Sequence, residues 1–140
     1  MAAKDSYHNQ CVHSLQKDGW LITHDPLTLR IGKTDVMIDL GAEQVVGAEW
    51  AGERIAVAIK SFIRPSAVYD LEQALGQFTL YKDVLERSAD DADRVLYLAV
   101  RATTYEEIFG EPIGKMLVEN KRLRLVVFDI NTEKIVQWIP

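Results

Sequence analysis

Apolar residues recur at helical spacing near the start of the chain and at strand spacing after it. From residue 3 to 17 the apolar positions lie three or four residues apart, and Gly19 follows as a helix stop. Asp25-Pro26 and Gly41 then interrupt β-rich runs, with a bulge predicted at Gly41, and the runs cover residues 20–23, 27–31, 34–40 and 44–50. The pattern predicts one helix followed by a meander of antiparallel strands.

The second part of the chain alternates strand and helix patterns. Residues 54–62 are almost continuously apolar, which is typical of a strand covered on both faces at the centre of a sheet. A long amphipathic helix is predicted from Pro65-Ser66 to about Ser88, and the further elements are a strand at 94–100, one or two short helices at 105–119, and strands at 123–129 and 135–139. This order predicts a single α/β domain over residues 1–140, with a mixed central sheet flanked by helices.

Side chains alternate along the central strand, so Lys60 shares a face with Ala58. A two-residue turn at Ala51-Gly52 would place Glu43 opposite Lys60 on the preceding strand. The sequence therefore predicts that Glu43 lies beside Lys60.

Composition narrows the class of protein. Apolar residues make up 48% and charged residues 26%, and no run approaches the ~18 apolar residues of a membrane span, so we expect a cytoplasmic globular protein. The net charge of −5 argues against broad attraction to phosphates, although Lys115, Lys121, Arg122 and Arg124 cluster late in the chain. Cys11 is the only cysteine, and we expect a buried structural thiol.

Two acids and one lysine carry the candidate chemistry. Asp35 and Asp39 are four strand positions apart and are expected to face the same way; such acids either need a cation or metal, or lie on a solvated face. Mg²⁺-dependent phosphodiester hydrolysis usually needs two carboxylates, and a lysine beside them orients the attacking hydroxide. Asp39 and Lys60 supply half of this set. Gln77 and Tyr81, one helical turn apart, could contact a phosphate or brace Lys60, or form an ordinary helix surface.

Segments throughout the chain resemble one known family. The segments are AKDSYHN, KDGWLITHDPL, IDLGAE, IAVAIKSF, ALGQFTLYK, RVLYLAV and IVQWI. In this order they resemble the cyanobacterial fdxN element excision controlling factor family, XisH, over nearly the whole chain. That family is similar to PD-(D/E)xK nucleases, which have a restriction-endonuclease-like core. The resemblance implies an accessory role in programmed excision of a DNA element, a form of site-specific recombination, together with a small partner protein encoded nearby.

The resemblance also assigns roles to particular residues. Asp39 matches the first acid of the nuclease frame, Lys60 the lysine, and Gln77 with Tyr81 the Gln-x-x-x-Tyr helix. Ala58 departs from the pattern, because the usual residue of the family at this place looks like Glu.

A methyl group cannot coordinate a metal. Either another acid, such as Glu43, joins Asp39 as a ligand of Mg²⁺, or the protein has lost the ion and binds without cutting. Asp5 and His8 match the opening helix of the family. The alternative to a catalytic role for His8 is a capped or solvated histidine on a helix.

These observations leave three candidate functions. The first is an excision-controlling factor on a degenerate nuclease fold, the second an active Mg²⁺-dependent endonuclease, and the third a protein-interaction module without DNA contact. DNA and a small protein are the candidate partners. We expect a homo- or hetero-oligomer through the apolar C-terminal strand, unless Trp138 folds back into the core; the strand's apolar residues are Ile135, Val136, Trp138 and Ile139.

Overall fold

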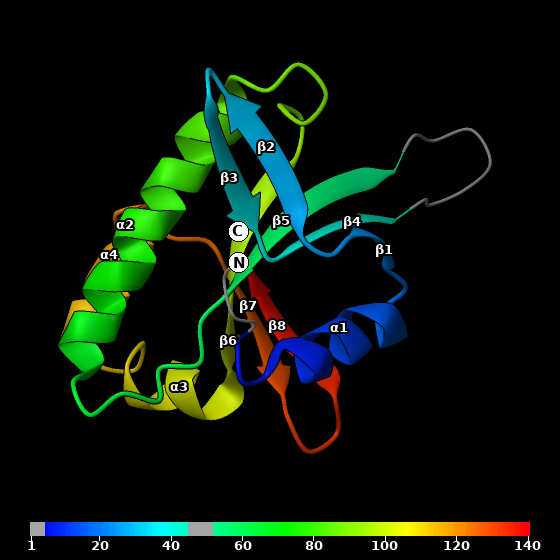
Figure 1. Cartoon of the computed structure of the whole chain (residues 1–140). Helices are drawn as coiled ribbons and strands as arrows, with labels where there is room; N and C mark the ends of the chain where they lie inside the picture. Colours follow the sequence, from blue (N-terminus) through cyan, green and yellow to red (C-terminus); the bar gives the residue numbers. More distant parts are fainter. Residues whose placement is uncertain (1–4, 45–51) are drawn as a thin grey trace.

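A mixed sheet with helices on both faces forms the body of the molecule (Figure 1). The computed structural model describes residues 5–44 and 52–140. In chain order its elements are α1 (His8–Lys17), β1 (Leu21–His24), β2 (Leu27–Ile31), β3 (Thr34–Ile38), β4 (Leu40–Gln44), β5 (Glu53–Ile59), α2 (Ala67–Glu86), β6 (Val95–Arg101), α3 (Ala102–Glu107), α4 (Pro112–Glu119), β7 (Leu125–Asp129) and β8 (Lys134–Ile139). The predicted α/β architecture is confirmed.

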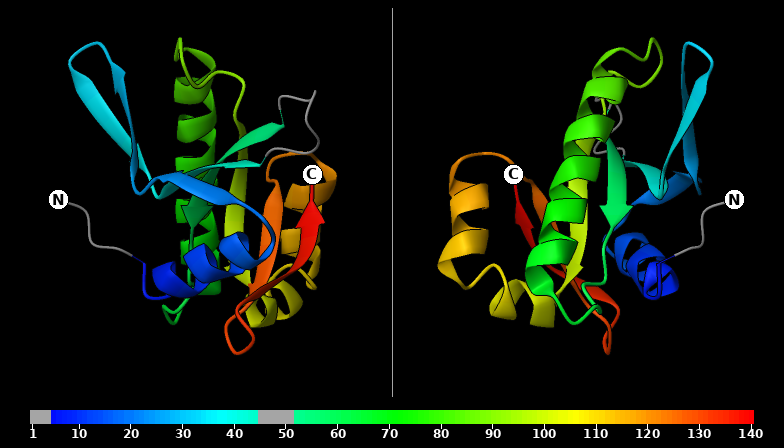
Figure 2. Two further views of the ribbon diagram at one scale, coloured as in Figure 1. Left: turned by 90° about the vertical axis from the view of Figure 1, so that its right-hand side faces the viewer. Right: turned by 60° about the vertical axis from the view of Figure 1, so that its left-hand side comes forward.

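The main sheet has six strands in the order β1-β4-β5-β6-β7-β8. Strands β5, β6 and β7 are parallel, whereas β1, β4 and β8 pair antiparallel with their neighbours. Strands β2 and β3 form a separate antiparallel hairpin, which projects from the body beside α2 (Figures 1 and 2). The long crossover α2 joins the parallel strands β5 and β6, as βαβ connections require.

Two buried clusters fill the space on either side of the sheet. Helices α2, α3 and α4 cover one face and α1 covers the other (Figure 2). Alternate residues of β5 divide between the clusters: Ala56 and Ala58 face α2, and Ile55, Val57 and Ile59 face α1. This confirms the predicted alternation and explains the unbroken apolar run, since both faces of β5 are covered.

Local capping and burial explain the long helix. The Ser66 side chain accepts a hydrogen bond from the Tyr69 amide at 3.2 Å, which caps the first turn of α2. Leu71, Ala74 and Phe78 recur at three- and four-residue steps and are buried against the sheet. No helix within the described ranges is long and apolar enough to cross a membrane.

The break in the predicted meander lies earlier than expected. Strand β3 ends at Ile38 and β4 begins at Leu40, so the sheet divides at Asp39 and not at Gly41. Gly41 pairs regularly with Ala56 of β5, but on its other side the register with β1 shifts between Ile22 and His24, the partner of Gly41. The irregularity therefore lies in β1, opposite the glycine at which the bulge was predicted. A Cβ at Gly41 would lie 3.2 Å from a nitrogen of the Arg94 guanidinium, so close approach of a buried side chain explains this glycine. The predicted strand at 44–50 lies almost wholly outside the described residues.

Arg94 holds the starting ends of the central strands together. Its side chain is fully buried, and its Nε donates to Asp91 Oδ1 at 2.7 Å. Its Nη1 donates to the backbone carbonyl of Ile55 at 3.0 Å, which links the loop before β6 to β5. A buried guanidinium needs such partners to offset its desolvation.

The C-terminal strand packs by its aromatic residue into the protein's own core. Trp138 lies with its ring centroid 5.6 Å from that of Trp20 and 4.9 Å from that of Tyr97. Strand β8 is an edge of the sheet and is irregular at Val136, which is 58% exposed. Irregular edges resist pairing with another strand, so β8 is a less favourable surface for assembly than its sequence suggested.

Candidate functional site

Asp39 occupies the point at which the chain leaves the hairpin and enters the main sheet. Its Oδ2 accepts a hydrogen bond from the Ile59 amide at 2.7 Å. Because β3 belongs to the separate hairpin, no strand residue before Leu40 pairs with β5, and the Asp39 carboxylate takes the place of a backbone carbonyl beside Ile59, the last residue of β5. The structure therefore places Asp39 next to the strand end that leads into Lys60.

The environment of Asp39 is poorly solvated and largely acidic. Burial is the largest influence and raises the pKa of the Asp39 carboxyl, while the hydrogen bond from Ile59 opposes this shift without cancelling it. Charge on His8 also lowers the pKa, whereas Asp5 and Asp25 raise it. Asp39 is the first acid of the predicted frame. Its surroundings favour the protonated carboxyl more than water does.

Lys60 follows β5 directly and lies on the side of the sheet that α2 covers. Its amine is 3.9 Å from Oδ1 of Asp70, in the first turn of α2. The Asp70 side chain is 2% exposed, and its Oδ2 accepts from the Arg64 amide at 3.2 Å. The Asp70 Oδ1 has no hydrogen-bond partner and faces Lys60 and Arg64 at ion-pair distance. Sequence reasoning missed Asp70, although an acid in the first turn of a helix is a recognisable signal.

Ala58 is packed beneath α2. It is 4% exposed and belongs to the cluster that contains Leu71 and Ala74 of that helix. The position at which the family pattern expects a carboxylate is therefore occupied by close apolar packing.

Glu43 does not lie beside Lys60, and the predicted register is wrong. Glu43 pairs with Arg54, at the opposite end of β5, and Arg54 Nε donates to its carboxylate at 3.1 Å. Lys60 is six positions after Arg54, which corresponds to about 20 Å at ~3.3 Å per residue. The expected metal pair of Asp39 and Glu43 is therefore separated by most of the length of a strand.

Asp35 is also remote from the candidate site. It lies in β3 within the projecting hairpin, where it faces Arg30 across the ladder with 3.5 Å between their charged atoms. The alternation that suggested a shared facing with Asp39 stops at the end of β3. Asp35 is exposed, which agrees with the alternative of a solvated face.

Asp5, which precedes α1, and His8, the first residue of α1, contact the segments around the candidate site. Asp5 Oδ2 accepts from both the amide and the hydroxyl of Ser61, at 3.0 and 2.6 Å, immediately after Lys60. His8 is 4% exposed, and its Nε2 lies 2.7 Å from Asp25 Oδ1. The expectation of a solvated His8 is wrong, because the turn before β2 covers the ring. No sequence signal indicated Ser61 or Asp25 as partners.

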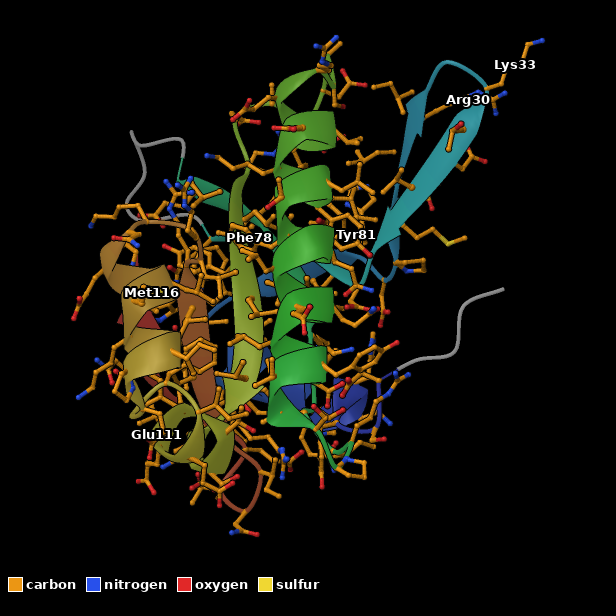
Figure 3. The ribbon with its side chains drawn as sticks, turned by 90° about the vertical axis from the view of Figure 1, so that its left-hand side faces the viewer. Arg30, Lys33, Phe78, Tyr81, Glu111 and Met116 are labelled. Carbon is orange, nitrogen blue, oxygen red and sulfur yellow. The ribbon has the colours of Figure 1, made fainter. Side chains whose placement is uncertain are left out.

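The Gln-x-x-x-Tyr pair is only partly directed at this site. Burial raises the pKa of the Tyr81 hydroxyl, and the next cause is the charge of Asp39, so the ring lies within electrostatic reach of that carboxylate. Tyr81 faces the hairpin side of α2, while Phe78 lies on its other side (Figure 3). Gln77 is exposed and forms no side-chain hydrogen bond with the part of the chain that the structure describes.

The donor set does not fit Mg²⁺. Within residues 5–44 and 52–140, no three His, Cys, Asp or Glu side chains are arranged to hold a metal ion. Asp39 offers one carboxylate, Ala58 offers none, and the acid nearest Lys60 is already faced by two cations. Hard divalent cations need several oxygen ligands.

Comparisons with known proteins agree on one relationship. The family model described as XisH protein matches residues 1–136. The crystal structure of an XisH family protein from Nostoc punctiforme PCC 73102 is 39% identical, with a TM-score of 0.85, and covers 97% of this chain and 100% of that chain. An fdxN element excision controlling factor protein from Anabaena variabilis is 38% identical, also with a TM-score of 0.85, and covers 98% and 100%. Among curated proteins, none matches.

Proposed function

The chain belongs to the XisH family, and on this basis we propose that it is an accessory factor that controls programmed excision of a DNA element. We further propose that it does so on a degenerate PD-(D/E)xK nuclease-like fold that no longer cuts DNA. One observation carries the second part: the frame retains Asp39 and Lys60, but Ala58 is packed under α2 where the second metal-binding carboxylate belongs.

The chemistry of phosphodiester hydrolysis explains why this loss matters. A divalent ion must hold the scissile phosphate and activate water, and a single carboxylate gives it too few protein ligands. Glu43 does not replace the missing acid at residue 58, because it is engaged with Arg54, about 13 Å from Ala58 along the strand. Asp39 instead completes the hydrogen bonding of β5, a role that needs no metal.

Lys60 has a structural partner that accounts for its presence. Asp70 is buried, and an unpaired buried carboxylate is costly, so the amine at 3.9 Å and Arg64 at 3.8 Å offset its charge. In this role Lys60 fixes the first turn of α2 to the end of β5. A lysine retained for this reason does not imply retained catalysis.

The cleavage test uses purified protein, supercoiled plasmid and Mg²⁺ or Mn²⁺. We expect no cleavage above the level of the Asp39→Asn variant. Robust metal-dependent nicking by the wild type that Asp39→Asn abolishes would show an active endonuclease and overturn the proposal of degeneracy.

The excision test uses cells that carry a reporter element and its recombinase. We expect excision to depend on the chain and to survive Asp39→Asn, since the side-chain amide keeps the hydrogen bond from Ile59. Excision that is unchanged when the chain is absent would refute the controlling role.

A double-mutant cycle tests the structural role of Lys60. Lys60→Met and Asp70→Asn should each destabilise the protein, and the double variant should recover part of the loss, with a coupling of about 0.5–3 kcal/mol. Additive effects of the two changes would show that the pair contributes nothing.

A further inference from the structure

The end of the β2–β3 hairpin stands clear of the rest of the described chain. At its base, three side chains are buried in the cluster beneath α2: Leu27, Leu29 and Ile38. Residues 30–35, which form the ends of both strands and the turn between them, are all exposed. Figure 3 shows Arg30 and Lys33 at the outer tip, and both views of Figure 2 show the hairpin projecting from the body. The hairpin is therefore anchored at its base and open to a partner at its end.

The basic side chains of this end are only weakly held by the protein. Lys33 forms no ion pair with the part of the chain that the structure describes. Arg30 lies 3.5 Å from Asp35, and because the two side chains are 66% and 52% exposed, this ion pair is weak. The Arg30 Nε also donates to the Gly32 carbonyl at 3.2 Å, which holds the guanidinium near the turn. Two cations and one acid at this end contrast with a chain in which 21 acids outnumber 16 bases.

The other acids of the hairpin lie at its base. Asp25 precedes β2, and Asp39 follows β3. Asp39 is six positions from Lys33, which corresponds to about 20 Å along a strand at ~3.3 Å per residue. Exposed side chains of both signs occupy the end of α2, on the same side of the molecule: Lys82, Asp83, Glu86 and Arg87. The tip is thus the part of the hairpin that attracts a polyanion, and the acids keep that partner away from the base.

The shape of the hairpin fits the major groove of duplex DNA. Strands β2 and β3 pair regularly along their whole length, so the ribbon is two strands wide up to its turn. The major groove of B-form DNA is about 12 Å wide and admits a two-stranded β-ribbon, whereas the major groove of duplex RNA is too narrow for side chains to read. Thr28, Arg30 and Lys33 place exposed hydrogen-bond donors along the ribbon. Such donors suit phosphate oxygens and base edges.

We propose that the end of the β2–β3 hairpin enters the major groove of duplex DNA, with Arg30 and Lys33 as its cationic contacts. This inference rests on the proposed role in excision of a DNA element, and it assigns the DNA contact to a surface separate from Asp39 and Lys60. Arg30 exchanges its weak pair with Asp35 for the DNA, so Asp35 opposes binding. Two cationic contacts give a logarithmic salt dependence of the binding constant with a slope of about −1.8.

The first experiment measures binding to a fluorescently labelled DNA duplex of about 20 base pairs by anisotropy. Wild-type affinity should fall roughly tenfold between about 50 and about 200 mM salt. Replacing both cations, Arg30→Gln with Lys33→Gln, should weaken binding at the lower salt by about tenfold or more and remove most of the salt dependence. Both positions are exposed, so the fold should be retained, which circular dichroism checks.

The matched control removes the same charge from another exposed place. Lys121→Gln with Arg122→Gln changes the loop after α4 and should bind the duplex as the wild type does.

A gain of affinity provides a second test, because damage to the fold cannot produce one. Asp35→Asn removes the acid that competes for Arg30, and it should tighten binding to the duplex roughly twofold to fivefold. Glu106→Gln, which removes an exposed acid from α3, is the matched control and should leave the affinity unchanged.

Three results would overturn the inference. The first is a wild type that binds no duplex at the lower salt. The second is equal weakening by the hairpin pair and by the control pair, which would leave net charge as the sole cause. The third is equally tight binding of a single strand of the same sequence, which would exclude docking in a groove. Excision that is unchanged without the chain refutes the controlling role instead, so the two failures are distinguishable.

Discussion

Asp39 offers a direct test, because its hydrogen bond and its charge can be removed separately. Asp39→Asn removes the charge and keeps an oxygen that can accept from the Ile59 amide, now 2.7 Å from the carboxylate. Asp39→Ala removes both. The difference between the two variants therefore reports the hydrogen bond, and the difference between Asn and wild type reports the charge.

The expected magnitudes follow from this geometry. Alanine leaves the Ile59 amide without an acceptor beside a buried strand, and an orphaned donor of this kind costs about 1–3 kcal/mol. For a protein of this size, Asp39→Ala should melt roughly 3–10 °C below Asp39→Asn. Asp39→Asn should be at least as stable as wild type at neutral pH, because burial raises the pKa of this carboxyl and so disfavours its ionised form.

The pH dependence has a definite sign. Below the unfolded-state pKa of about 3.9 the carboxyl is protonated in both states, and its ionisation does not affect stability. As the pH rises through the interval up to the raised folded-state pKa, wild type loses stability relative to Asp39→Asn, and the gap is constant above it. Urea unfolding followed by circular dichroism across this interval measures the gap. An Asn variant less stable than wild type at pH 7, or one no more stable than the Ala variant, would refute the reasoning.

Three further predictions concern the buried interior. Arg94→Met should destabilise the protein by about 3–5 kcal/mol in urea unfolding, because Asp91 and a strand carbonyl lose a fully buried partner; a loss below ~1 kcal/mol would contradict this. Ala58→Glu should cost several kcal/mol without metal, since it forces a carboxylate against Leu71, and calorimetric titration with Mn²⁺ should show whether the new acid binds an ion. Cys11 should resist a thiol reagent until urea unfolds the chain, because burial raises the pKa of its thiol and blocks access.

The sequence predicted those elements whose burial pattern is local. The unbroken apolar run of β5 and the helical spacing of Leu71 and Phe78 identified the central strand and α2, since each pattern reflects a surface that the element must bury. The register of β4 was wrong because it rested on an assumed two-residue turn at Ala51-Gly52. The observed pairing of Glu43 with Arg54 differs from that assumption by six positions.

The candidate site depended on contacts that leave no pattern in the chain. Ser61 meets Asp5 across 56 positions, and Asp25 meets His8 across 17. Asp39 was a candidate acid from its place in an apolar run and from the resemblance, but no sequence pattern indicated that its carboxylate accepts from the Ile59 amide at the end of β5. Long-range partners of this kind are fixed by topology, which periodicity alone does not describe.

Asp39 joins the projecting β2–β3 hairpin to the main sheet, so the position of the hairpin is coupled to the end of β5. Asp39, between the end of β3 and the start of β4, is also the residue whose side chain accepts from the last amide of β5. A rotation of the hairpin about Asp39 would move its carboxylate relative to the Ile59 amide and so weaken this hydrogen bond. The hydrogen-exchange rate of the Ile59 amide would therefore report movement of the hairpin, and it can be measured without a label on the hairpin.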